Sequence, residues 1–111
     1  MSENVIDKKN STKINFLKTL SEKSLYLDEF KENVILALTR KQVMSGIIYT
    51  EVIEEMKKEG TACIKMRRDV PLKDFNPYIM EAEKAGIQYT LVDALDMKGD
   101  IVLVVVSKEA I

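Results

Sequence analysis

The sequence predicts a single α/β domain with a mixed four-stranded sheet, in the order strand, helix, strand, helix, strand, strand. Alternating apolar residues at 61–66 and 87–92 are typical of half-buried strands. Between these two segments the apolar residues recur at the spacing of a helix. The run IVLVVV at 101–106 predicts a strand buried on both faces. We place the domain over residues 25–111, because 111 residues give room for one core. The polar residues 1–24 are expected to form a flexible segment.

The apolar block VILALT at 34–39 is the ambiguous element of the chain. Periodicity alone does not separate a buried strand from a buried helix over so few residues. Its β-branched start and its terminal Thr39 favour a strand, preceded by a helical turn over residues 28–33.

Two helices are predicted between the first three strands. The first has Thr50 as its N-cap and ends before Gly60, which suits the position after a helix. For the second, Pro71 predicts a turn that lasts to Phe75. Asn76 then caps the helix and Pro77 takes its first position.

The strand order follows from these connections. A strand-helix-strand crossover makes its two strands parallel, so the first three strands run the same way. The fourth follows a short polar link at 93–100 and is expected to return antiparallel. The result is a compact mixed sheet rather than a doubly wound nucleotide-binding domain.

Composition excludes several classes of function. The net charge of −1, from 17 basic and 18 acidic residues, argues against a general polyanion binder. Histidine is absent and Cys63 is the one cysteine, so we expect no zinc site, no cofactor and no catalytic residue of a recognisable kind. Cys63 itself is typical of a small buried apolar residue. With neither a signal peptide nor an apolar run of about 20 residues, we expect a cytoplasmic protein without a membrane partner.

Two segments of the chain resemble a known family. LDEFKENVILALTRKQV at 27–43 is similar to a pattern that ends in LALT and QV, and PYIMEAEKAGIQYTLV at 77–92 is similar to PYI, Ala, GI and an apolar strand. On these residues the chain resembles the YueI-like family of uncharacterised bacterial proteins. Asp28 and Lys41 stand where the family pattern has Gly, and Arg67-Arg68-Asp69 where it has Asn-Gly.

The resemblance implies a chorismate-mutase-like fold with the returning strand inside the sheet, and it carries no catalytic residues. The same fold occurs in kink-turn RNA-binding ribosomal proteins, whose RNA-contacting loop contains Gly, Asn and Glu. Here that loop reads Thr39-Arg40-Lys41-Gln42, so the signature is missing. Fold alone does not assign function.

The candidate site lies where the three parallel strands end. The carboxyl ends of parallel strands meet at one edge of a sheet, where ligands tend to bind. That edge receives four cations: Arg40, Lys41, Arg67 and Arg68. Arginine suits phosphate or carboxylate, so these residues predict an anion-binding rim. The alternative is an ordinary solvated loop in which Arg68 pairs with Asp69 or Asp93.

The sequence therefore favours a small binding or regulatory domain, more readily than an enzyme, with an anionic small molecule as its ligand. RNA binding is the first alternative, suggested by the implied fold and the local cations. A metabolic enzyme with an active site between subunits is the second. An exposed strand edge also makes a homodimer an expectation.

Overall fold

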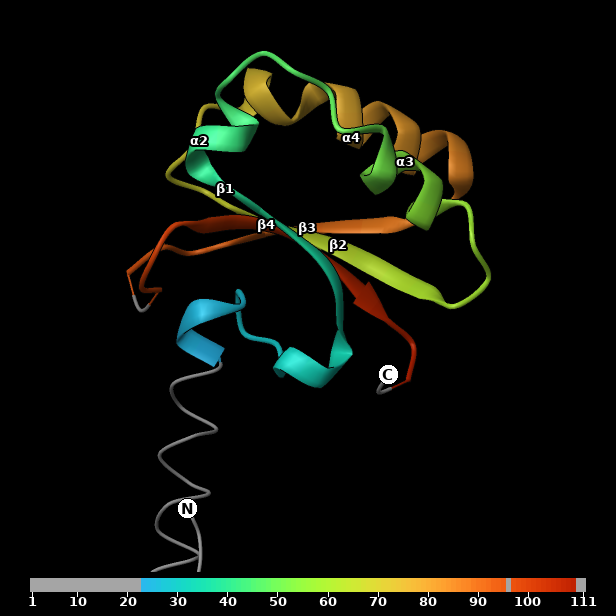
Figure 1. Ribbon diagram of the computed structural model, residues 1–111, viewed down its shortest axis with the longest axis horizontal. Coiled ribbons are helices and arrows are strands. Elements are labelled where there is room, and N and C mark those ends of the chain that lie inside the picture. The colour runs from blue at the N-terminus through green and yellow to red at the C-terminus, as the bar shows by residue number, and fades with distance from the viewer. Residues whose placement is uncertain (1–22, 96, 110–111) are drawn as a thin grey trace, which may run out of the picture.

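The computed structural model describes residues 23–95 and 97–109, which form a four-stranded sheet with the helices of residues 40–85 on one face and residues 23–33 on the other (Figure 1). The prediction of a flexible segment at 1–24 falls almost entirely outside these residues and stays a prediction. In chain order the elements are η1 (Lys31–Asn33), β1 (Val34–Thr39), α2 (Arg40–Val43), α3 (Thr50–Met56), β2 (Thr61–Arg67), α4 (Leu72–Ala85), β3 (Gln88–Val92) and β4 (Ile101–Ser107).

The strand order in the sheet is β1-β4-β2-β3. β2 and β3 are parallel, and β4 runs antiparallel to both of its neighbours, β1 and β2. This confirms the predicted fold class, including the returning strand inside the sheet. The ambiguous block at 34–39 is a strand.

β4 is the centre of the structure, because its residues from Val102 to Val106 are buried. Such a strand needs an apolar cover on both faces. The register with β1 shifts near Val102, where β4 carries one extra residue, so Val102 and Leu103 both join the helix-side core.

The helix-side core is built by α3 and α4 (Figure 1). Val52 and Met56 of α3 and Phe75, Tyr78 and Ala82 of α4 are almost completely buried there. Tyr78 also joins α4 to the start of α3, because its hydroxyl oxygen accepts a hydrogen bond from the Tyr49 N–H, at 2.9 Å. The pKa of Tyr78 is raised because burial disfavours its charged form.

The opposite face of the sheet is covered by residues 23–33. Leu27 is fully buried there, against Val104 and Val106. Leu27 and Asp28 have φ values of 55° and 71°, in the left-handed region. The Asp28 N–H donates to the carbonyl of Lys23, at 2.8 Å, which is the bond that closes a Schellman-type helix end. A side chain at such a position is strained. The conformation accounts for the glycine expected at position 28 in the family pattern.

Three helical segments differ from the sequence prediction. α3 has Tyr49, not Thr50, at its N-cap, because the first helical hydrogen bond runs from the Val52 N–H to the Tyr49 carbonyl. It also ends at Met56 with Lys57 as its C-cap, so Gly60 lies beyond the helix end. α4 begins at Leu72, not after Asn76, and Pro77 lies inside it. Pro77 removes the hydrogen bond that its N–H would donate to the carbonyl of Lys73. Complete burial of Phe75 in the core favours the longer helix nonetheless. The residues after Thr39, read as a loop, form the short helix α2.

Within residues 23–95 and 97–109, no helix has the length and apolar character that crossing a membrane requires.

The left-handed conformation at position 28 predicts that glycine is more stable there than alanine, which is the reverse of the order at an ordinary φ. Asp28→Gly and Asp28→Ala both remove the carboxylate and differ by one Cβ. At φ of 71° that Cβ costs about 1 kcal/mol. We therefore expect the Gly variant to have the larger free energy of unfolding in urea, by about 1 kcal/mol. At an ordinary φ the Ala variant would be the more stable, so that result would contradict the left-handed turn.

Candidate functional site

The first cation of the predicted rim is positioned by the end of β1. Thr39 caps α2: its hydroxyl accepts from the Gln42 N–H, while the Gln42 side chain accepts from the Thr39 N–H. The N–H of Arg40 then donates to the carbonyl of Asp100, at 2.7 Å. These bonds fix the Arg40 backbone beside the start of β4 and direct its side chain over the end of the sheet.

Arg40 and Arg67 meet on one carboxylate. Arg67 donates from Nε and Nη2 to the two oxygens of Asp69, at 3.1 and 2.7 Å, which is a bidentate pair. Arg40 Nη2 donates to the same Oδ2, also at 2.7 Å. Arg67 Nη1 further donates to the carbonyl of Gly99, at 3.0 Å. We call Arg40, Arg67 and Asp69 the Asp69 cluster; it joins the ends of β1 and β2 to the link that precedes β4.

The Asp69 cluster is structural in character. Arg67 is 7% exposed, so its charge is almost entirely removed from water and needs the carboxylate beside it. Hydrogen bonds from Arg67 and then Arg40 lower the pKa of Asp69, against the opposing effect of burial. A solvated loop cation at position 67 could be removed at little cost. Substitution of the buried and paired Arg67 should instead destabilise the fold.

The other two predicted cations do not join the Asp69 cluster. Lys41 lies on the exposed side of α2, and Arg68 is exposed beyond the end of β2. Within the described residues neither side chain forms an ion pair. The Arg68 backbone is held in place because its N–H donates to the carbonyl of Val92, at 2.9 Å. The alternative in which Arg68 pairs with Asp69 is therefore wrong, since Asp69 binds Arg67 and Arg40.

Arg68 lines an open hollow of about 460 Å³ between the start of α4 and the end of β3. The other lining residues are Asp69, Val70, Pro71, Leu72 and Leu91. The hollow thus combines one unpaired cation with an apolar wall.

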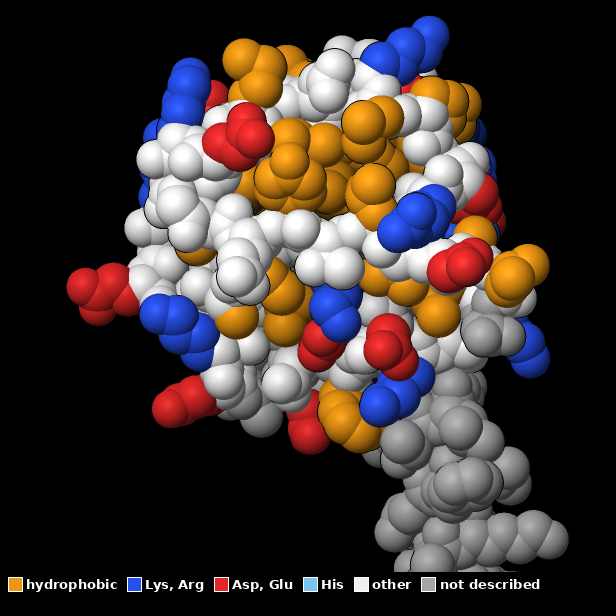
Figure 2. Space-filling view, turned by 180° about the vertical axis from the view of Figure 1, so that it is seen from behind, with side chains coloured by type: hydrophobic (Ala, Val, Ile, Leu, Met, Phe, Trp, Pro, Cys, Tyr) orange, Lys and Arg blue, Asp and Glu red, His pale blue; other side chains and the backbone are white. Residues whose placement is uncertain are grey.

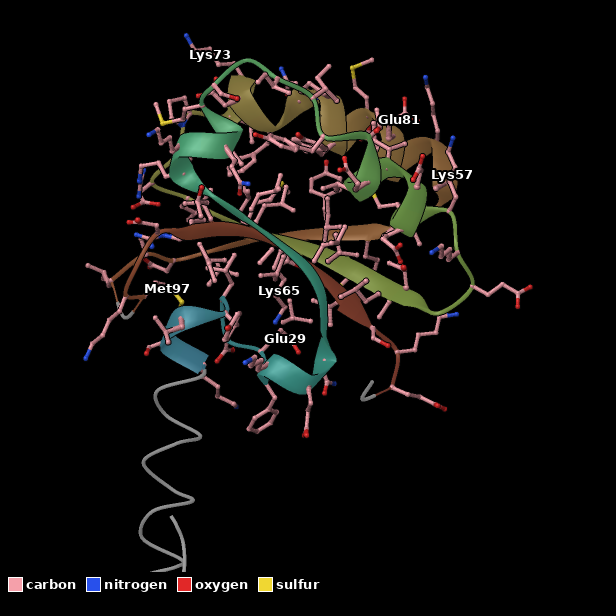
Figure 3. All side chains as sticks on the ribbon, in the orientation of Figure 1. Glu29, Lys57, Lys65, Lys73, Glu81 and Met97 are labelled. Atoms are coloured by element: carbon pink, nitrogen blue, oxygen red, sulfur yellow. The ribbon has the colours of Figure 1, made fainter. Side chains whose placement is uncertain are left out.

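The two cationic side chains of β2, Lys65 and Arg67, bind different carboxylates. Lys65, two positions before Arg67, points away from the helices toward Glu29 (Figure 3). Its Nζ lies 2.5 Å from Glu29 Oε2, and the two side chains are 17% and 20% exposed. This ion pair attaches the segment at 23–33 to the sheet. Lys65 is therefore part of the structure and not of the rim.

Other candidate groups have structural environments. Cys63 is partly buried against the Leu27 side of the sheet, and burial raises the pKa of its thiol, which disfavours the reactive thiolate. No group of three or more His, Cys, Asp or Glu side chains in residues 23–95 and 97–109 is arranged to hold a metal ion. Tyr89 is exposed at the edge of the sheet.

Sequence reasoning missed two members of the site. The sequence suggested Asp69 as a partner of Arg68 alone, although its place two positions after Arg67 allows the bidentate pair that forms. Gly99 acts through its carbonyl, which carries no sequence signal, because every residue has one.

Comparison with known proteins agrees with this architecture. Residues 6–111 match the family described as "Protein of unknown function (DUF1694)". The chain belongs to this family. It is 26% identical to "Uncharacterized protein YueI" of Bacillus subtilis (strain 168) over 90 residues, which cover 81% of this chain and 68% of that protein. This confirms the predicted YueI-like resemblance.

A solved structure has the same fold. The crystal structure of the YueI protein from Bacillus subtilis matches with a TM-score of 0.76 at 22% sequence identity, covering 90% of this chain and 86% of that one. At this level of identity the likeness shows the fold of the DUF1694 domain.

The Asp69 cluster predicts a specific dependence of stability on pH. A carboxylate whose pKa is lowered by folding contributes stability above its unfolded pKa of about 3.9, and that contribution is lost as the pH falls through the folded value. We expect Asp69→Asn to lower the free energy of unfolding at pH 7 by about 1 kcal/mol, since the side chain is partly exposed. The difference from the unmodified protein should shrink below about pH 4. Urea unfolding of both proteins from pH 7 to pH 2 measures it; a difference that does not change with pH would contradict the ion-pair explanation.

Proposed function

We propose that this DUF1694 protein binds a small anionic ligand in the hollow at the carboxyl edge of the sheet. One observation supports this most strongly: the amino end of α4, which has no side-chain cap, opens into the hollow beside the unpaired Arg68. The proposal keeps the edge that the sequence predicted and narrows the contact residues from four cations to one cation and a helix end.

The start of α4 leaves backbone donors available. Pro71 occupies the N-cap position and has no side-chain oxygen or nitrogen with which to bind them. Asp74 is the first residue whose N–H bonds back, to the carbonyl of Pro71 at 3.0 Å. The N–H groups of Leu72 and Lys73 therefore have no intrahelical acceptor. An anion bound there would also interact favourably with the positive end of a 14-residue helix.

Arg68 would add a full positive charge to the partial positive charge of the helix end. A guanidinium binds a phosphate or carboxylate through two parallel hydrogen bonds. Arg68 is exposed, while its backbone is held by the bond to Val92, so the side chain can adapt to a ligand without disturbing β2.

The rest of the hollow indicates what the ligand would carry besides its charge. Val70, Pro71, Leu72 and Leu91 form an apolar wall. A phosphate or carboxylate with an attached aromatic or aliphatic group would bury that group against the wall. A bare inorganic anion would leave it unused, so the proposed ligand is amphiphilic.

The Asp69 cluster would act as the support of the hollow. It fixes Asp69 next to Arg68 and leaves the Asp69 carboxylate compensated by two guanidiniums. An incoming anion would therefore meet little repulsion from it. Lys41 would contribute through its charge at longer range, since it does not line the hollow.

The proposal predicts that Arg68→Ala weakens anion binding with little change in stability. The probe is phenyl phosphate, titrated into labelled protein and followed by backbone amide NMR shifts. We expect shifts at residues 68–73 and at Leu91. Losing a charge-assisted hydrogen bond of about 1.5–3 kcal/mol should raise the Kd about tenfold or more in Arg68→Ala.

Lys57→Ala is the matched control, because Lys57 is also an exposed cation and lies away from the hollow, near the end of α3 (Figure 3). Equal weakening by both variants would show a diffuse charge effect and refute the hollow as the site. Nucleic acid that co-purifies and dissociates with a steep salt dependence would favour the RNA alternative instead.

A further inference from the structure

We propose that two copies of this chain associate through the free edge of β3 and the outer side of α4, joining their sheets across a twofold axis. The proposal does not require that a ligand binds in the hollow, although Leu72 and Leu91 belong to both surfaces. It rests on the surface around β3 and α4. We call this surface, made of Leu72, Met80, Ile87, Tyr89 and Leu91, the α4–β3 surface.

β3 is an unprotected edge strand. Within the described residues it pairs with β2 alone, in an unbroken parallel register over five residue pairs. The Val92 carbonyl accepts from Arg68, so residues 88, 90 and 92 turn their backbone groups toward β2. Tyr89 and Leu91 turn theirs outward, because successive residues of a strand alternate in this direction. Their N–H and C=O groups are free to pair with another strand.

β3 also lacks the features that normally prevent edge pairing. Its sequence QYTLV contains neither a charged residue nor a proline. The other edge strand, β1, is protected differently, because a register shift between Val34 and Leu36 breaks its regular ladder. Of the two edges, β3 is the one suited to pairing.

An apolar surface continues from the β3 edge onto α4. Ile87 and Leu91 pack against the helix-side core, and Tyr89 lies on the same face of the strand between them. Leu72 and Met80 of α4 are 52% and 56% exposed. Figure 2 shows this side of the molecule, where an apolar area lies across the upper half and charged side chains surround it. Exposed apolar area of this kind marks an interaction surface.

The charges beside this surface indicate that its occupant is a second copy. Lys73, Asn76, Met80 and Glu83 follow one another at spacings of three, four and three, so they form one stripe along the exposed side of α4. The stripe has a cation at its amino end and a carboxylate at its carboxyl end.

A twofold axis makes two such stripes complementary. Antiparallel pairing of β3 with the same strand of another copy sets the two α4 helices antiparallel on the same side of the joined sheet. Lys73 of each copy then lies opposite Glu83 of the other, and the apolar middles meet. The arrangement leaves the Glu83 and Lys73 charges paired, whereas a parallel arrangement would place like charges together.

The test is the mass in solution, measured by light scattering and sedimentation over a concentration series. We expect twice the chain mass of 12.7 kDa for the unmodified protein. Thr90→Lys places two cations side by side on the paired edges, and Met80→Lys does so between the helices. Each should raise the dimer Kd at least tenfold. Ile47→Lys is the control, because Ile47 is similarly exposed, at 60%, and lies outside the α4–β3 surface.

A charge exchange tests the antiparallel arrangement itself. K73E and E83K should each weaken the dimer several-fold, and the double variant should restore it, because it exchanges the two ends of the stripe. Circular dichroism and urea unfolding confirm that each variant folds. A protein that stays monomeric at its highest soluble concentration would overturn the proposal. A dimer that Ile47→Lys disrupts while Thr90→Lys does not would overturn it equally.

Discussion

The burial of β4 on both faces is the constraint on which the rest of the structure depends. A strand with five consecutive buried residues is stable only if each face of the sheet has its own apolar cover. On one face α3 and α4 provide it, and on the other the segment at 23–33 does, with Leu27 against Val104 and Val106. Within residues 23–33 the second cover has no long helix, and it is held by a left-handed turn at Leu27–Asp28 and by the Glu29–Lys65 ion pair. Strain at the turn is tolerated because burial of Leu27 offsets it.

The Asp69 cluster lies at the same edge of the sheet as the hollow that we propose as a ligand site, and it holds that edge together. Arg67 is buried, yet its charge is compensated by a bidentate carboxylate, and its remaining donor satisfies the carbonyl of Gly99. A buried ion pair of this kind positions the chain more than it strengthens the fold. It holds the end of β2 against the start of β4, and it leaves Arg68 alone at the surface. Three consecutive residues thus combine a buried, paired cation, its carboxylate partner and an exposed cation, which is the one that we propose for ligand binding.

The two edges of the sheet differ because of how the chain enters and leaves them. β1 is bulged at its start and passes directly into α2 through the Thr39 capping box. β3 is regular, short and uncharged, and it follows α4 through a left-handed Gly86. An unprotected parallel edge strand beside exposed leucine and methionine side chains is costly for a monomer to maintain, since it invites uncontrolled association. The second copy that we propose at that edge would remove the risk.

The sequence by itself determined the order of strands and helices, the parallel course of the first three strands and the edge where they end. Apolar periodicity and crossover length carry this information locally, so Thr50–Met56 and Ile101–Ser107 follow from their own residues. For Val34–Thr39 the β-branched start, and not the periodicity, favoured the strand. The sequence also brought Arg40 and Arg67 to the same edge.

Only the tertiary structure decided which cations are free. Arg67 and Lys65 are neutralised by carboxylates that lie near them in space, and one of those, Glu29, lies far away in the chain. The start of α4 was likewise decided by tertiary packing, because burial of Phe75 outweighs the local turn preference of Pro71 and Pro77. Contacts between distant segments, such as the pair of Lys65 with Glu29 and the burial of Phe75, are encoded by no local pattern.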